Sequence, residues 1–534
     1  MIIPTSAKAA PGSTLDRLDR IAVGYLMMPL VVFLAGWFQW WVALPLIGCV
    51  AYALKPLFGT QAAATRLPVT GLQLAIAISA GCAWTVLGGA DHLAFANADW
   101  HIRDAVLHDL VSSPWPVGYG LLDDKESLLR APVAFYLPAA LVGKWLGLAA
   151  AHVAMGCWTA AGATLFLLQV LSLTPSRPGI ALMVTAVVVM FSGLDIVGNL
   201  LNDGPRFRYD WNITTHLEWW AGKFQYSSMT TQLFWVPNHA LGGWLSIGLL
   251  YRNRRSVALN SMLPVIVVAL ALWSPLTALG VLPFMAMRAA TDSVRDRSLA
   301  LLHPKVWVPA MLVGVVIAAY LILDPSRIPR GLAIGAASDS PVMDLMQQAQ
   351  FFLLEAGFIG GAIFAIRRSA EVALALLILG LLPLVYLGPA NDFVMRASIP
   401  SLAVLTIGAC LALVELSADK AAYRKKALLV GLLLIGAVTP VEEIARAALL
   451  PAWPINMGAT LIGADCGGFA PHYVARLGGE VIGRMLRPTH RLPIGPQGPA
   501  ACDNPALDLM WSWSFTPRNN AHPIKSARGG SGNS

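Results

Sequence analysis

Charged residues are scarce in this sequence. Of its 534 residues only 12% are Asp, Glu, Lys or Arg, whereas 57% are hydrophobic, and both values lie far from those of soluble proteins. This composition excludes a set of soluble domains. The net charge of +8 does not indicate a nucleic-acid partner, because the Lys and Arg residues form short clusters between apolar runs, as membrane topology requires. No nucleic-acid partner is expected.

Several motifs are also missing. No CxxC and no HExxH pattern occurs, which leaves little basis for a zinc site. Strand-like alternation of polar and apolar residues is absent, which favours helices over strands. The first 20 residues lack the apolar core of a cleavable signal peptide, so none is expected.

Long apolar runs dominate what is present. They lie near residues 21–37, 38–55, 68–89, 132–149, 151–172, 179–200, 232–251, 257–273, 276–290, 306–323, 349–366, 370–387, 398–416 and 427–446. Runs of this length predict transmembrane helices, because a helix satisfies its own backbone hydrogen bonds inside a bilayer. We therefore expect an all-α polytopic membrane protein in the lipid bilayer, with about 13 to 14 transmembrane or re-entrant helices.

The basic loops predict an orientation. Clusters at 252–255, 288–297, 367–368 and 420–426 should be cytoplasmic. The expected organisation is a cytoplasmic N-terminus (1–20), a transmembrane domain (21–446) and an extramembrane C-terminal tail (447–534), in a bacterial inner (plasma) membrane. The outer loops are then 90–131, 202–228, 324–348 and 388–397.

The helix count contains a conflict. Three apolar runs lie between two loops that are both assigned to the outside, so one early window must be re-entrant or interfacial. The weakest is 132–149, which is short and contains Lys144.

The cysteines divide by location. Four lie inside apolar runs, where Cys is usually a small buried hydrophobe. Cys466 and Cys502 are the only pair in the tail, and they are expected to form one disulfide if the tail lies in an oxidising compartment.

The first outer loop concentrates ionisable groups. In "ADHLAFANADWHIRDAVLHDLVSSPWPVGY" (90–119), Asp99 stands as an N-cap ahead of a helical pattern. One side of that helix would be apolar, and the other would carry His101, Asp104 and His108. The pattern predicts an amphipathic helix at the outer surface, within a large first outer loop.

Three interpretations of this helix remain open. In the simplest, Asp99 is a cap and the other charges form a solvated face. In the second, a carboxylate of the loop is a general base that accepts a proton from an acceptor hydroxyl. In the third, His101, Asp104 and His108 hold a metal ion.

Two further outer segments carry candidate residues. The segment 202–245 contains five Trp together with Gln232 and His239; Trp stacks on sugar rings but also belongs at membrane interfaces. In "GPANDFVMRASIP" (388–400), Arg396 lies where the chain re-enters the bilayer, beside Asn391 and Asp392. An ionisable residue at that depth is a functional candidate, and its alternative role is a structural ion pair with Asp392.

These groups suit chemistry on a lipid-phosphate-linked sugar. The lipid chain needs a groove between helices, and the leaving phosphate needs an Arg or Lys to stabilise its charge. The acceptor hydroxyl needs a base, and the oxocarbenium-like sugar needs water excluded.

At this point the chain resembles a family. "ADWHIRDAVLHDL" resembles the first outer loop of the GT-C superfamily of polytopic, lipid-phosphate-sugar-dependent glycosyltransferases, whose hallmark is an Asp in that loop. The trio "DW…DL…WPVGY", "FWVPNHALGGWL" and "NDFVMRASIP" also resembles a group of bacterial membrane proteins associated with that superfamily. The resemblance covers about residues 70–446. It implies a membrane glycosyltransferase that moves a sugar from a polyprenyl-phosphate donor to a glycan or lipid acceptor of the cell envelope, at the extracytoplasmic face.

The resemblance also implies the site. Asp99 or Asp91 would be the counterpart of the family's catalytic Asp, and Asp109 is the next candidate. Residues expected to contact substrate are Trp100, Arg103, Gln232, His239, Asn391, Asp392 and Arg396. No DxD or ExD pair occurs, so a divalent metal remains possible but not obligatory, and no other cofactor is expected.

Other classes of protein stay open. A secondary transporter or a flippase of an envelope precursor would have about as many helices, but it should show internal repeats and charges at mid-membrane. The expected spans are nearly free of charge. A non-catalytic envelope scaffold would not need Asp and His gathered beside an interfacial Arg.

Overall fold

A computed structural model describes residues 15–58, 67–122, 124–203, 216–222, 224–254, 256–296, 303–325, 328–333, 341–388, 391–418, 422–464 and 473–491. Within these ranges seven helical stretches are long and apolar enough to cross a membrane: Arg17–Trp37, Leu148–Leu171, Pro178–Asn202, Pro304–Leu321, Val342–Ile366, Asp392–Ser417 and Tyr423–Leu449. The protein is therefore a predominantly helical, multi-pass membrane protein. Cys466 and Cys502 lie outside the described residues.

The first half of the chain, to Arg252, contains α1 (Arg17–Trp37), α2 (Trp40–Ala53), η1 (Lys55–Phe58), α3 (Gly71–Leu87), α4 (Asp99–Ser112), β1 (Val117–Leu122), β2 (Lys125–Leu129), α5 (Leu137–Leu146), α6 (Leu148–Leu171), α7 (Pro178–Met190), α8 (Asp195–Asp203), η4 (Leu217–Ala221), α9 (Met229–Trp235) and α10 (Pro237–Arg252). The remainder contains α11 (Val257–Trp273), α12 (Pro275–Asp296), α13 (Pro304–Leu321), β3 (Arg330–Leu332), α14 (Pro341–Phe352), the π-helical turn η7 (Leu353–Gly357), α15 (Phe358–Ile366), α16 (Ala370–Leu381), η8 (Leu382–Leu384), β4 (Val385–Leu387), α17 (Asp392–Ala397), α18 (Ile399–Ala418), α19 (Tyr423–Gly436), α20 (Val438–Leu449), α21 (Leu461–Ala464), β5 (Val474–Arg476), α22 (Glu480–Met485) and β6 (His490–Arg491).

Each apolar run found in the sequence overlaps a helix of the structure. The run at 132–149 is the shortest case, because α5 has only 10 residues. At 1.5 Å per residue such a helix is about 15 Å long, half the thickness of the hydrocarbon core. Gly147, with φ +89, then turns the chain into α6. A positive φ is a conformation that glycine adopts without a steric penalty.

Close helix packing relies on small residues and on satisfied polar groups. Thr70 and Gln73 form a reciprocal capping box at the start of α3, and the Gln73 amide donates to the Leu171 carbonyl of α6. Gly81 of α3 lies directly against Thr164 of α6, where a Cβ atom would collide. Backbones can approach this closely only where one residue is small.

The basic segments gather at one end of the molecule. Arg252, at the end of α10, pairs with Asp16 and Asp19 beside the start of α1. Arg254 pairs with Glu371, which follows the basic turn at 367–368. His239 lies at the other end of the 16-residue α10, so about 20 Å of helix separates it from Arg252.

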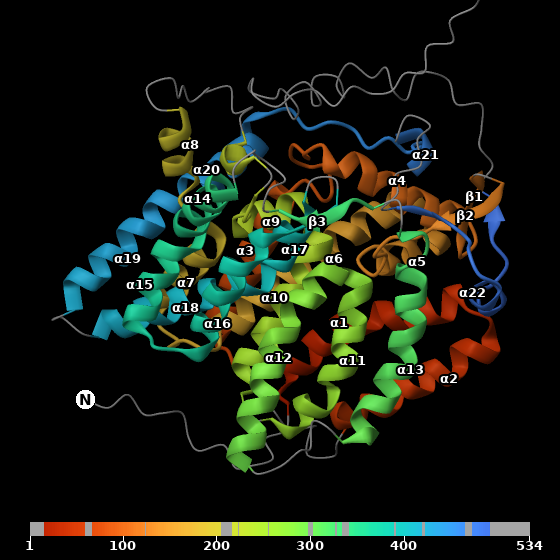
Figure 1. The fold of residues 1–534 in the computed structure, drawn as a ribbon, viewed down its shortest axis with the longest axis horizontal. Coiled ribbons are helices and arrows are strands. Elements are labelled where there is room, and N and C mark those ends of the chain that lie inside the picture. The colour runs from red at the N-terminus through yellow and green to blue at the C-terminus, as the bar shows by residue number, and fades with distance from the viewer. Residues whose placement is uncertain are drawn as a thin grey trace, which may run out of the picture.

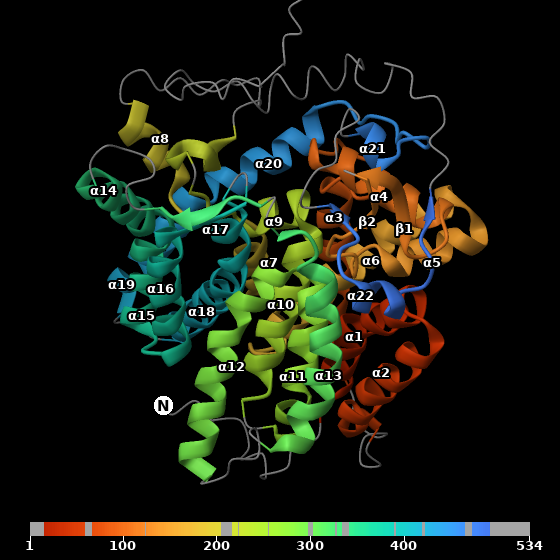
Figure 2. The same ribbon diagram turned by 45° about the vertical axis from the view of Figure 1, so that its right-hand side comes forward.

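A polar layer occupies the opposite end. Figures 1 and 2 show α4, α8, α20 and α21 along one end of the bundle, while α12 extends to the other. The C-terminal tail contributes α21 and two short strands to this layer. These elements bring residues from distant parts of the chain together.

The expectation of helices alone needs one correction. The first outer loop contains a hairpin, β1 and β2, and the tail extends it into a four-stranded sheet of order β5-β2-β1-β6. β5 pairs antiparallel with β2, with Leu128 opposite Ala475, and β6 runs parallel to β1. β3 and β4 form a second, two-stranded sheet. The strands have two to six residues, too few for an alternating pattern to stand out.

Candidate functional site

The helix of the first outer loop is buried, which overturns the expected solvated face. In α4 the side chains of both sides are covered, and the exposed fractions of His101 and Asp104 are 6% and 4%. The short helix α21, from the tail, packs on α4 together with α5 and α6. A cover that comes from residues some 350 positions away leaves no local pattern in the sequence.

Asp99 is not the N-cap of that helix. α4 begins at Asp99 itself, and the capping position belongs to Ala98. The side chain of Asn97 accepts a hydrogen bond from the Asp99 backbone N–H and donates to the Phe234 carbonyl of α9. The Asp99 carboxylate is consequently not used as a cap, and 45% of its side chain is exposed.

Arg103 pairs with the Asp99 carboxylate. Its Nη2 lies 3.2 Å from Asp99 Oδ2 and donates to Asn238 Oδ1 at 3.4 Å, and its Nη1 donates to the Asp99 carbonyl at 2.9 Å. Only 5% of the Arg103 side chain is exposed. An accessible carboxylate that pairs with a buried guanidinium is held in a fixed orientation, as a general base requires.

A second guanidinium, that of Arg396, lies within electrostatic range of His239, as Arg103 does. Arg396 of α17 pairs with Asp392 at 2.8 Å, which agrees with the alternative role considered for it. The His239 ring is within electrostatic range of both Arg103 and Arg396, and Tyr473 of the tail interacts with both ion pairs. We call the side chains of Asp99, Arg103, Asn238, His239, Asp392, Arg396 and Tyr473 the arginine cluster.

Three polar atoms of the arginine cluster have no hydrogen-bond partner within the described part of the chain. They are Arg103 Nε, Arg396 Nε and His239 Nδ1. A buried polar group without a partner costs about 1–3 kcal/mol and calls for an explanation. Two guanidinium groups with unused donors suit an anion such as a phosphate.

The other candidate residues have structural roles. Asp109 is fully buried and accepts hydrogen bonds from the Tyr119 hydroxyl and the Leu461 N–H, and Asp91 accepts from the Leu93 N–H. Further residues of this kind are Trp100, whose indole donates to Gly88 and Phe234, Gln232, which accepts from Trp244, and Asn391, which accepts from Leu387 within a turn at φ +55. Of these five, Trp100 alone contacts the arginine cluster in a described interaction, because the Arg103 guanidinium carbon lies 5.7 Å from the centroid of its ring.

The suggested trio of metal ligands does not converge. Asp104 pairs with His92 at 2.8 Å and lies 3.8 Å from His152 of α6, whereas His108 contacts Asp109. Within the described ranges no group of three or more His, Cys, Asp and Glu side chains is placed to hold a metal ion. Asp104 instead links the first outer loop to α6.

A second group of ionisable residues escaped the sequence analysis. It consists of five carboxylates that are at most 3% exposed, with one Arg and one His: Asp195, Glu218, Glu355, Glu442, Glu443, Arg446 and His216. We call it the acid cluster. Most of its members lie inside the apolar runs that predict transmembrane helices. One or a few ionisable residues in a long apolar run lower its mean hydropathy only slightly.

Within the acid cluster, Glu443 contacts both the arginine and the histidine. It pairs with Arg446 and lies 3.0 Å from His216 Nδ1, and it accepts a hydrogen bond from the Trp235 indole at 2.9 Å. Arg446 also pairs with Glu442 at 3.2 Å. This half of the acid cluster is a buried network of paired charges.

Asp195 and Glu355 form the other half. Asp195 Oδ2 accepts from Ser192 and Thr439, and Glu355 Oε1 accepts from the Trp220 indole. The second oxygens of these carboxyl groups, Asp195 Oδ1 and Glu355 Oε2, are buried and have no hydrogen-bond partner among the described residues. A buried acceptor without a donor is costly.

The acid cluster predicts a pH dependence of stability. Burial raises the pKa of Glu218 to about 7. Burial by itself lowers the pKa of His216, but the neighbouring Glu443 outweighs it and the pKa is raised. Both groups thus bind protons more tightly in the folded than in the unfolded state, so stability should fall as the pH rises.

We expect the melting temperature in detergent to drop between about pH 5 and about pH 8. Glu218→Gln should flatten the part of this drop between the unfolded pKa of 4.5 and about 7, whereas Glu126→Gln, on an exposed residue of β2, should leave it unchanged. Equal slopes for Glu218→Gln and the parent protein would contradict the assignment.

Comparisons with known proteins add no family. No protein-family model, no curated protein and no solved structure matches this sequence. The class that the fold defines is a helical multi-pass membrane protein with a buried polar layer at one end, and any finer assignment rests on the residues of that layer.

Proposed function

We propose that the protein is a membrane glycosyltransferase that moves a sugar from a polyprenyl-phosphate donor to a cell-envelope acceptor at the outer face of the membrane. The observation that carries this proposal is the pairing of an accessible Asp99 with a buried Arg103, with Arg103 and Arg396 both within electrostatic range of His239. A base for the acceptor and cations for the leaving phosphate are the two requirements of the reaction.

Each group has a role in this scheme. The acceptor oxygen attacks the anomeric carbon while its proton passes to the Asp99 carboxylate. The bond between that carbon and the phosphate oxygen breaks, and the polyprenyl phosphate leaves with the electron pair. Arg103 and Arg396 stabilise its negative charge through charge-assisted hydrogen bonds.

The direct test uses the purified protein in detergent or nanodiscs with labelled polyprenyl-phosphate sugars. We expect at least one donor to be discharged onto an envelope glycan or lipid acceptor. No discharge of any donor by folded protein would reject the proposal.

Arg396→Lys tests the phosphate role. Lys keeps the charge but cannot bind phosphate in a bidentate way, so we expect kcat to fall by about tenfold or more, with donor binding weakened less. If Arg396 only pairs with Asp392, Arg396→Lys should be mild. A double-mutant cycle of Arg396→Gln and Asp392→Asn, measured by sugar transfer and by thermal stability, separates the two roles, because rescue of transfer by the double neutral variant contradicts phosphate binding.

One observation favours proton-coupled transport as a second candidate. Asp195, Glu355 and Glu443 lie within the apolar stretches Pro178–Asn202, Val342–Ile366 and Tyr423–Leu449, so these spans contain a few ionisable residues. Ionisable groups at such positions are typical of proton pathways. Proton movement by proteoliposomes that is lost in Glu355→Gln, with no sugar transfer, would favour this candidate.

A further inference from the structure

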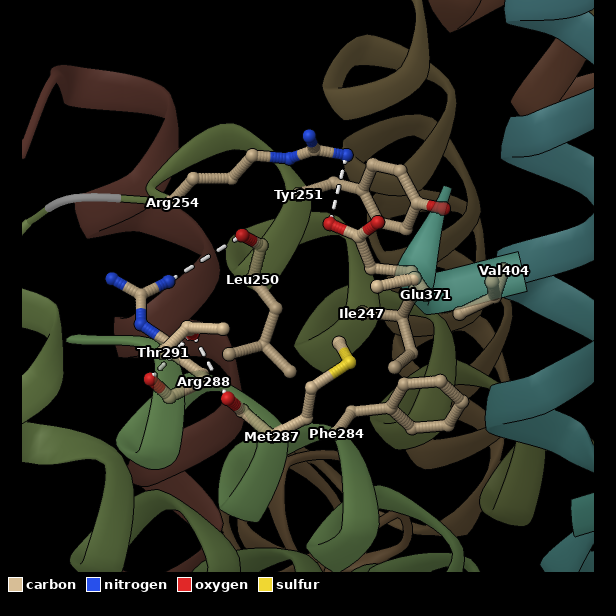
Figure 3. Close-up of a pocket in the computed structure, with 11 residues that line it drawn as sticks. Ile247, Leu250, Tyr251, Arg254, Phe284, Met287, Arg288, Thr291, Glu371 and Val404 are labelled. Carbon is tan, nitrogen blue, oxygen red and sulfur yellow. Dashed lines mark hydrogen bonds and ion pairs between the residues drawn. The ribbon is translucent and has the colours of Figure 1, made fainter. Parts of the chain in front are cut away.

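A cavity of about 260 Å³ lies at the end of the molecule where the basic segments gather. It is enclosed by α10, α12, α16 and α18 (Figure 3), and its lining consists of Ile247, Leu250, Tyr251, Arg254, Phe284, Met287, Arg288, Thr291, Ala370, Glu371 and Val404. It is remote from the arginine cluster, because α10 has His239 at one end and Tyr251 at the other.

The lining is divided into an apolar and a polar part. Ile247, Phe284 and Met287 lie together on one side in Figure 3, and Arg254, Tyr251 and Glu371 lie together on the other. The apolar part has no groups for a fully polar ligand to pair with, whereas an amphipathic ligand matches both parts.

Arg254 is the cation that a ligand can reach. Its side chain is 49% exposed, it pairs with Glu371 at 3.0 Å, and it stacks on the Tyr251 ring with the guanidinium carbon 5.0 Å from the centroid. Arg288 has a different role, because it is 7% exposed and donates to Asn260 and to backbone carbonyls at the α10 to α11 turn. A guanidinium that uses few of its five donors can still bind phosphate oxygens.

The position of the cavity indicates that its ligand is a membrane lipid. Basic segments at helix ends lie in the headgroup region, where anionic phospholipids supply the opposite charge, and Tyr251 suits the same region as an interfacial aromatic. We infer that this cavity binds one anionic phospholipid of the membrane, with an acyl chain among Ile247, Phe284 and Met287 and its phosphate on Arg254. The inference does not depend on sugar transfer.

The test compares lipids added to the delipidated full-length protein. We expect phosphatidylglycerol to raise the melting temperature more than phosphatidylcholine does, and inorganic phosphate to have little effect. Arg254→Gln should weaken phosphatidylglycerol binding, measured by native mass spectrometry, about tenfold, because it removes a charge-assisted hydrogen bond. Met287→Trp, which fills the cavity, should reduce the binding of both lipids.

Arg424→Gln is the matched control. Arg424 is also exposed and stacks on a tyrosine, Tyr423, with the guanidinium carbon 6.0 Å from the ring centroid, but it does not line the cavity. Its replacement should leave lipid binding unchanged. Equal losses for Arg254→Gln and Arg424→Gln, equal effects of the two lipids, or an equal effect of inorganic phosphate would each overturn the inference.

Discussion

Asp99→Asn should lower the rate of sugar transfer by about 10²- to 10⁴-fold, the usual contribution of a general base. The protein should stay folded, because the amide oxygen can still accept from Arg103, and Arg103 keeps its hydrogen bonds to the Asp99 carbonyl and to Asn238. The measurement is transfer from a labelled polyprenyl-phosphate sugar, alongside the melting temperature. Full activity in a well-folded Asp99→Asn variant contradicts the assignment.

Asp91 and Asp109 serve as controls for this prediction. Asp91→Asn should be nearly neutral, because its side chain supports only a local turn through the Leu93 N–H. Asp109→Asn should reduce stability more than chemistry, since Asp109 accepts from both Tyr119 and Leu461 inside the protein. If Asp91→Asn abolished transfer and Asp99→Asn did not, the role of base would pass to Asp91.

Glu443→Gln should destabilise the protein by about 3–5 kcal/mol, the usual cost of breaking a buried ion pair from one side. The amide cannot neutralise Arg446 or His216, which stay buried beside it. Thermal unfolding in detergent at neutral pH measures the effect. An unchanged melting temperature would show that these side chains are not a charged network.

Glu355→Gln is the contrasting variant in the same acid cluster. Its amide oxygen can still accept from the Trp220 indole, and its amide N–H supplies a donor where Asp195 Oδ1 has no hydrogen-bond partner among the described residues. We therefore expect a change below about 1 kcal/mol, the net value of a typical hydrogen bond. A loss as large as that of Glu443→Gln would contradict this expectation.

Apolar runs were a sufficient guide to the helices. A helix in a bilayer satisfies its backbone within its own segment, so the information needed to place it is local. The run at 257–273, for example, coincides with α11 at both ends. The run at 132–149, the weakest in the sequence, contains α5, which at 10 residues is too short to cross the hydrocarbon core.

Of the candidate site, the sequence identified individual residues and the Arg396–Asp392 ion pair, but not the pairing of Asp99 with Arg103. Asp99, Arg103, His239, Asp392 and Arg396 come together in the structure. Asn238 and Tyr473 were missed, because neither residue type is unusual in its own segment. The acid cluster was missed for a different reason, since its members lie in separate segments and become a group only when α8 packs against α20, η4 and η7.

The sequence by itself determined that this is a multi-pass helical membrane protein and where its helices lie, because low charge and apolar length act within one segment at a time. Only the tertiary structure decided what covers α4, which carboxylates are buried together, and that the tail completes the sheet of the first outer loop. Burial and ion pairing depend on contacts between residues hundreds of positions apart, such as Asp109 with Leu461. No periodicity within a segment records such contacts.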